Sequence, residues 1–154
     1  MIEYRKATIS EIETLVKIRV HFLREANNIV SDTDEEVLHK SNREYMAVSM
    51  GDGSFVSWIA ADDGKIIATS GVSFYTVPPN KSCPTGKTAY ISNMYTYPPY
   101  RNKGIATRLF DLAVQEAISN GYIKIFLNAT TLGRPIYEKF GFKETENEMI
   151  YYAL

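Results

Sequence analysis

The sequence has few of the residues that disulfide frameworks, metal centres and membrane spans require. Its one cysteine, Cys83, cannot form an intrachain disulfide, and its two histidines, His21 and His39, lie outside any H-E-x-x-H or C-x-x-C pattern. No apolar run approaches the ~18 residues that span a bilayer, and residues 1–6 lack the apolar core of a signal peptide. We therefore expect a cytoplasmic protein without a metal ion or a membrane partner.

An excess of charge of either sign is also missing. The chain has 17 Lys and Arg against 18 Asp and Glu, a net charge of −1, so no overall field favours nucleic acid as a partner. An anion could therefore bind only at a local site with its own positive charge or N–H donors. The 154 residues, 45% of them hydrophobic and 23% charged, are typical of one globular domain over 1–154 and not of disordered or fibrous classes.

The first half of the chain reads as strand, two helices and a hairpin. Residues 2–7 alternate as a short strand, and Thr8 with Glu11 forms a capping box that starts an amphipathic helix. A second box, Thr33 with Glu36, starts a weaker helix that ends before Gly51 and Gly53. The β-rich segments 55–61 and 66–77 follow, joined by the hairpin dipeptide Asp63–Gly64.

The second half adds a crossover. A strand over 88–97, a helix over 104–120 and a strand over 122–128 form a strand–helix–strand unit, which implies a right-handed parallel connection. A short helix at 132–140 and a last strand at Met149–Ala153 complete the order. The fold class is therefore α+β, with a mixed, mostly antiparallel sheet.

The segment Arg101-Asn102-Lys103-Gly104-Ile105-Ala106-Thr107 lies between a predicted strand and a predicted helix. Its small residues allow backbone amides to face outward at a helix N-terminus, where free N–H groups and the helix dipole favour an anion such as phosphate. A plain strand-to-helix turn with solvated basic residues is the alternative. Dinucleotide and ATP sites are disfavoured, because no G-x-G-x-x-G or G-x-x-x-x-G-K-[ST] occurs.

A second element lies downstream, in Gly133-Arg134-Pro135-Ile136-Tyr137-Glu138-Lys139-Phe140-Gly141-Phe142. Together with the stretch from Tyr95 to Ala106, it resembles the GCN5-related N-acetyltransferase family, GNAT. The resemblance rests on the R/Q-x-x-G-x-G/A loop at 101–106, on Y-x-K-x-G-F at 137–142 and on the order of elements over nearly the whole chain. It implies the GNAT fold, with helices on both faces of the sheet.

The same resemblance implies an acetyl-CoA site where two strands splay apart. Pantetheine would pair with the strand at Met94, Tyr95 and Thr96, and the pyrophosphate would bind the amides of the 101–107 loop. A backbone N–H near 94–96 would polarise the thioester carbonyl, and Tyr137 would contact the cofactor and protonate the departing thiolate. A core tyrosine with a satisfied hydroxyl is the alternative for Tyr137.

Two departures from the family pattern leave roles open. Ser92 and Asn93 stand where many members carry a carboxylate, so deprotonation of the amine would run through water or through Glu25 on the first helix, which could equally be a surface charge. Thr130 and Gly133 stand where the family often has Asn and Ala. Asn128 or Thr130 would then supply the polar contact to pantetheine.

The acceptor side carries no readable motif. Arg19 interrupts the apolar stripe of the first helix and is a candidate for binding a substrate carboxylate, although a buried backbone or acidic partner would explain it equally well. Tyr75 and Asn93 are the other substrate-binding candidates. The resemblance implies an acetyl-CoA-dependent N-acetyltransferase acting on a small-molecule or peptide amine by direct attack in a ternary complex.

Two alternatives to this activity remain open in the sequence. The missing carboxylate also fits a non-catalytic acyl-CoA-binding regulatory or sensor module, and a hydrolase using Cys83 would need an adjacent base that the sequence does not offer. The apolar ending at 150–154 permits a homodimer.

Overall fold

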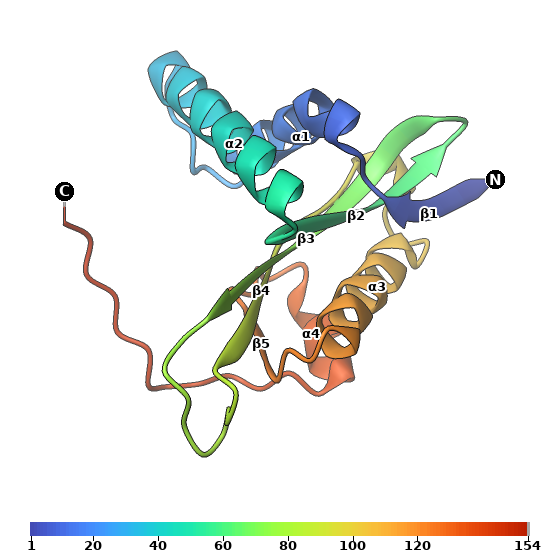
Figure 1. Cartoon of the computed structure of the whole chain (residues 1–154). Helices are drawn as coiled ribbons and strands as arrows, with labels where there is room; N and C mark the ends of the chain where they lie inside the picture. Colours follow the sequence, from blue (N-terminus) through green and yellow to red (C-terminus); the bar gives the residue numbers. More distant parts are fainter. Residues whose placement is uncertain (154) are drawn as a thin grey trace.

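The computed structural model describes residues 1–153 and forms a mixed sheet with helices on both faces (Figure 1). The five strands lie in the order β1-β2-β3-β4-β5; β1 to β4 pair antiparallel and β4 pairs parallel with β5. The predicted fold class is confirmed. The elements are β1 (Ile2–Lys6), α1 (Ile12–Glu25), α2 (Asp32–Asp52), β2 (Phe55–Asp62), β3 (Lys65–Thr76), β4 (Lys87–Thr96), α3 (Ile105–Ser119), β5 (Lys124–Leu127) and α4 (Arg134–Phe140).

Local signals place most element boundaries. The backbone N–H of Thr8 donates to the Glu11 carboxylate over 2.8 Å, as the capping box predicts, and a short 3-10 turn leads into α1. At the hairpin, Asp63 and Gly64 have φ of 47° and 78°, the left-handed pair that a tight two-residue turn needs. The second helix begins earlier than predicted, because the Ser31 hydroxyl accepts from the Asp34 N–H and caps α2 ahead of Thr33.

Two apolar layers hold the sheet between the helices. α1 and α2 cover one face, and their core includes Val16, Met46 and Phe55. α3 and α4 cover the other face, where Phe110 and Tyr137 pack on Val72 and Ile91. Because side chains alternate along a strand, neighbouring residues of β4 serve opposite layers.

The predicted last strand is wrong. The structure assigns no strand to Met149–Ala153, and these residues extend away from the sheet with Met149, Tyr151 and Tyr152 largely exposed (Figure 1). A short run of apolar and aromatic residues favours an extended chain, but it does not supply a partner strand for the backbone N–H and C=O groups. Leu154, the end of the segment predicted to permit a dimer, lies outside the described residues.

No helix within residues 1–153 is both long and apolar enough to cross a membrane.

Candidate active site

β4 separates from β5 part-way along its length. The two strands pair from Thr88 with Lys124 to Ile91 with Leu127, where β5 ends, while β4 continues to Thr96 beside β3 alone. The peptide groups of β4 beyond Ile91 therefore present an unpaired edge. An extended ligand can hydrogen-bond to such an edge as an added strand would.

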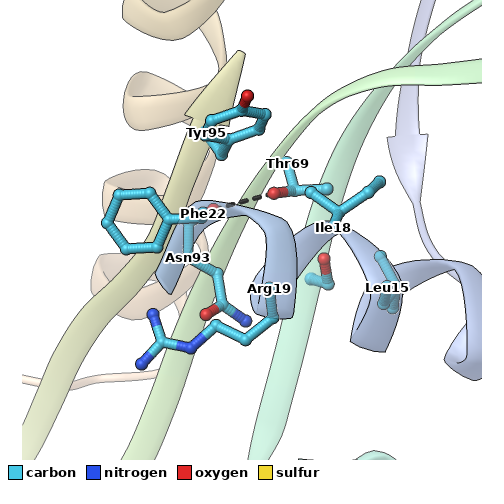
Figure 2. Close-up of a pocket in the computed structure, with 8 residues that line it drawn as sticks. Leu15, Ile18, Arg19, Phe22, Thr69, Asn93 and Tyr95 are labelled. Carbon is cyan, nitrogen blue, oxygen red and sulfur yellow. Dashed lines mark hydrogen bonds between the residues drawn. The ribbon is translucent and has the colours of Figure 1, made fainter. Parts of the chain in front are cut away.

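A bulge lies at the start of this open edge. The register between β3 and β4 shifts between Thr69 and Gly71, and Asn93 has a φ of 55°. The Thr69 hydroxyl donates to the Asn93 carbonyl over 2.8 Å and fixes the bulge (Figure 2). A Cβ at Gly71 would lie 2.7 Å from the Phe55 ring, so only glycine fits opposite the bulge. The bulge turns Asn93 toward α1 and Met94 toward α3.

The loop after β4 turns sharply into α3. Asn102 and Gly104 both have positive φ, 61° and 77°, which reverse the chain just before the helix. The N–H of Arg108 donates to the Gly104 carbonyl at 3.0 Å, so the N–H groups of residues 105–107 have no acceptor inside the helix. These amides, at the positive end of the α3 dipole, form an arrangement that can hold a phosphate.

Arg101 points away from those amides and joins the loop to α1. Its guanidinium donates to Glu25 over 2.8 Å and to the Thr96 carbonyl over 2.8 Å, and the Tyr95 hydroxyl donates to the same carboxylate over 2.7 Å. The hydrogen bonds from Arg101 and Tyr95 lower the pKa of Glu25. Burial and the Glu25 carboxylate raise the pKa of Tyr95 to about 12. Sequence reasoning missed this cluster because Glu25 and Arg101 are far apart in the chain.

Tyr137 lies in the α3 layer with a hydroxyl that remains available. Its ring packs 4.9 Å from the Phe110 ring, and its side chain lies against Gly133, where an added Cβ would be 2.6 Å from the hydroxyl. Burial raises the pKa of Tyr137. The Tyr137 hydroxyl has no hydrogen-bond partner within residues 1–153. In this part of the chain, Nε1 of Trp58 is the side-chain polar atom that is both fully buried and without a partner. The Tyr137 hydroxyl is therefore not fully buried and can be reached by solvent.

An aromatic surface lies on the α1 face of the sheet, beside the point where β4 and β5 begin to separate. Phe126 packs 4.9 Å from Tyr90 and 6.5 Å from Tyr75 between ring centroids. The Asn128 amide donates to the Tyr90 hydroxyl over 3.2 Å. Tyr75 is 41% exposed. The predicted substrate residue Tyr75 and the predicted cofactor residue Asn128 therefore border one surface.

Arg19 projects from α1 into a small pocket at the bulge. Figure 2 shows its side chain passing beside the Asn93 amide and near the Phe22 ring, and the guanidinium lies 5.7 Å from that ring's centroid. Burial lowers the pKa of Arg19 because its charge is partly removed from water. The pocket is lined by Leu15, Ile18, Arg19, Phe22, Ser57, Thr69, Asn93 and Tyr95.

Residues 1–153 contain no group of three or more side chains able to hold a metal ion. The thiol of Cys83 is buried and donates to the Lys87 carbonyl, away from the splay.

Comparison with known proteins identifies the family of this chain. The model of the acetyltransferase (GNAT) family matches residues 18–142. The chain belongs to the GNAT family. A crystal structure of a predicted acetyltransferase with acetyl-CoA from Clostridium acetobutylicum is 38% identical, with a TM-score of 0.91 over 99% of this chain and 96% of that one.

More distant GNAT structures keep the same architecture. A GCN5-related N-acetyltransferase from Ralstonia eutropha JMP134 is 27% identical, with a TM-score of 0.89 over 99% of both chains. Glucosamine-6-phosphate N-acetyltransferase from Arabidopsis thaliana, 23% identical with a TM-score of 0.68 over 99% of both chains, shares the fold alone. No curated protein matches the sequence. The family resemblance seen in the sequence is confirmed.

Proposed function

We propose that this GNAT protein binds acetyl-CoA in the splay between β4 and β5 and transfers the acetyl group to a primary amine. The observation that carries the proposal is the open edge of β4 leading to the α3 N-terminus. The 38% identical structure from Clostridium acetobutylicum was determined with acetyl-CoA, which supports this donor.

The loop binds the pyrophosphate mainly through its backbone. The amides of 102–107 and the α3 dipole face the anion, and the left-handed Gly104 leaves open space where a side chain would otherwise stand. Lys103, whose ammonium lies 5.5 Å from the Tyr100 ring, adds a positive charge near the loop. Arg101 acts as a positioning residue instead, because its guanidinium already binds Glu25 and the Thr96 carbonyl.

Pantetheine and the thioester occupy the β4 edge. The peptide groups of Met94 and Thr96 pair with the pantetheine amides, and a backbone N–H in 94–96 donates to the thioester carbonyl as negative charge develops on its oxygen. Asn128 borders the far side of the splay. This arrangement leaves the carbonyl carbon open to attack from the α1 face, where Asn93 and the pocket lie.

The transfer step is a direct displacement. The neutral amine nitrogen attacks the carbonyl carbon, a C–N bond forms, and the C–S bond breaks as the electron pair leaves on sulfur. Tyr137 donates its phenolic proton to the thiolate, and bulk water then returns a proton to Tyr137. The amine's own proton passes to water, because the lowered pKa of Glu25 and its two hydrogen bonds make that carboxylate a weak base. Glu25 positions Arg101 and Tyr95.

Calorimetry with a matched pair of variants tests the donor site. Asn and Asp both tolerate the left-handed backbone of Gly104 and are similar in size, so Gly104→Asn and Gly104→Asp differ chiefly in charge. We expect Gly104→Asn to bind acetyl-CoA more weakly than the wild type, because its side chain occupies the open space, and Gly104→Asp to lose binding altogether because it also repels the pyrophosphate. Equal binding by both variants would show that the pyrophosphate lies elsewhere.

Thiol release tests the chemistry. We expect Tyr137→Phe to bind acetyl-CoA as the wild type does and to lower kcat by on the order of 100-fold, the usual effect of removing a general acid. Acetyl-CoA binding without turnover of any amine, unchanged in Tyr137→Phe, would identify a non-catalytic acyl-CoA-binding module.

A further inference from the structure

Arg19 differs from every other arginine of the chain in having no carboxylate partner. Within residues 1–153, neither an ion pair within 4.0 Å nor a hydrogen bond is found for its guanidinium, whereas each remaining arginine lies within that distance of a carboxylate. Those pairs are Arg5–Glu11, Arg24–Glu35, Arg43–Glu13, Arg101–Glu25, Arg108–Asp111 and Arg134–Glu144. The sequence left open a buried acidic partner for Arg19, and the described residues contain none.

The surroundings of Arg19 solvate its charge poorly. Its neighbours are the Phe22 ring, the Asn93 amide and Tyr90, none of which is an anion comparable to a carboxylate (Figure 2). Moving a guanidinium out of water is costly unless it is paired and hydrogen-bonded. The other arginines in the described part of the chain are paired with carboxylates, so the guanidinium of Arg19 is the one that can bind an anion from outside the chain.

The position of Arg19 connects it to the reaction. Arg19 and Asn93 line the same pocket, and Asn93 is the bulge residue directly before the open segment Met94–Thr96. Tyr90 extends this region along the same face of β4 to the aromatic surface with Tyr75 and Phe126. A small molecule over the bulge therefore has one end near the thioester and another end near the guanidinium.

We propose that the acetyl acceptor is a small primary amine that also carries an anionic oxygen group, a carboxylate or a phosphate, and that Arg19 binds this group. The planar guanidinium presents parallel N–H donors that match two oxygens of either group. The aromatic surface packs against the rest of the molecule. This inference rests on the proposed acetyl transfer, and Arg19 acts in it as a specificity-determining residue.

Paired amines test the proposal in the full chain saturated with acetyl-CoA. β-Alanine, phenylalanine and O-phosphoethanolamine are compared by thiol release with β-alaninamide, phenylalaninamide and ethanolamine, which keep the amine and lack the anionic group. Each kcat/KM is expressed per concentration of neutral amine, because the two members of a pair differ in amine pKa. We expect kcat/KM for at least one anionic member to exceed that of its counterpart by about 10-fold or more, the usual effect of a hydrogen bond to a charged group. Which pair responds distinguishes carboxylate from phosphate.

Variants of Arg19 link the preference to this residue. We expect Arg19→Gln to abolish the ratio within each pair while leaving acetyl-CoA affinity unchanged, and Arg19→Lys to restore part of it. Arg24→Gln, which removes an exposed arginine of the same helix, is the control and should leave the ratio intact. Thermal melting shows whether each variant folds. If Arg19→Gln does not fold, Arg19→Lys is compared with the wild type in its place.

Three results would overturn the proposal. One is a preference for the members that lack the anionic group. Another is an equal loss for both members of a pair in Arg19→Gln, which would indicate a structural role. If acetyl-CoA binds but no amine reacts, calorimetric titration of the anionic compounds into the CoA complex decides, and absence of Arg19-dependent binding refutes the idea. Failure of acetyl-CoA itself to bind would instead refute the proposed function.

Discussion

Gly133→Ala gives a sharp test of the position of Tyr137. An added Cβ would lie 2.6 Å from the Tyr137 hydroxyl oxygen and 2.8 Å from the ring carbon that carries it, whereas ordinary contacts begin at 3.4 Å. The hydroxyl must therefore move by about 0.4 Å to reach the tightest contacts that occur, at 3.0 Å, and by about 0.8 Å to reach an ordinary contact. The ring has little freedom because it packs against Phe110. The family often has Ala at this position, so in this chain Gly133 lets the Tyr137 hydroxyl lie where the Cβ of that Ala would stand. A displacement approaching 1 Å costs up to the order of 100-fold in rate when the moved group takes part in the reaction.

Stability should change much less than rate. Gly133 has a helical backbone, with φ of −84° and ψ of −22°, so alanine reduces the freedom of the unfolded chain and stabilises by about 0.4–1 kcal/mol. Overpacking against Tyr137 opposes this with about 1–3 kcal/mol. We expect a slightly lower Tm, unchanged acetyl-CoA affinity by calorimetry and a large fall in kcat measured by thiol release.

Gly51→Ala is the matched control, because a Cβ at Gly51 meets nothing within 4 Å and the residue lies inside α2. It should keep full activity and gain up to about 1 kcal/mol in stability. Full activity in Gly133→Ala, together with a large fall in kcat for Tyr137→Phe, would refute the reasoning that the position of this hydroxyl is critical.

The remaining predictions concern stability and its dependence on pH. The pKa of Tyr95 is raised from 10.0 to about 12, so its protonated form stabilises the fold below pH 10 and this contribution is lost as pH rises toward 12. Tyr95→Phe should therefore flatten a plot of Tm against pH between pH 10 and 12. Glu11 has its pKa lowered from 4.5 to about 2, mainly by its hydrogen bond from Arg5, so its contribution is present above pH 4.5 and lost as pH falls toward 2. Glu11→Gln should lower the unfolding free energy by about 1 kcal/mol at pH 7 in urea titrations, because both partners are partly exposed, and should remove most of that acid dependence. Glu25→Gln should cost about 1 kcal/mol or less, since the Arg101–Glu25 pair is also partly exposed, and an undiminished Tm at high salt in the wild type would contradict a contribution from this pair.

Much of the fold could be predicted because its signals are local. The capping box at Thr8, the Asp63–Gly64 turn and the small residues of the 101–107 loop each act within a few residues of chain. The local structures follow from the φ preferences of these residues and from backbone groups that need hydrogen-bond partners. Both properties belong to the residues themselves and do not depend on the rest of the fold. The mixed sheet followed from the crossover rule.

The rest depends on contacts between distant segments. The bulge residue Asn93 is not a glycine, and its marker Gly71 lies on the neighbouring strand, as does Thr69, which donates to the Asn93 carbonyl. The partner of Arg101 could not be predicted, since Glu25 reaches it only after α1 packs on the sheet. The predicted strand at 149–153 failed for the complementary reason, since a short apolar run says nothing about whether a partner edge is available.

α1 carries both Arg19 and Glu25 on one continuous helix of 14 residues. Glu25 is tied to the loop that leads into α3, and Arg19 reaches the pocket on the other side of the bulge. A helix moves as a stiff rod, so any shift that donor binding imposes on the Arg101 loop is transmitted to the acceptor pocket. Thermodynamic linkage makes this coupling reciprocal: whatever factor the donor adds to acceptor affinity, the acceptor adds to donor affinity. In the proposed reaction, the position of this single helix therefore couples the affinities of the two substrates, whichever of them binds first.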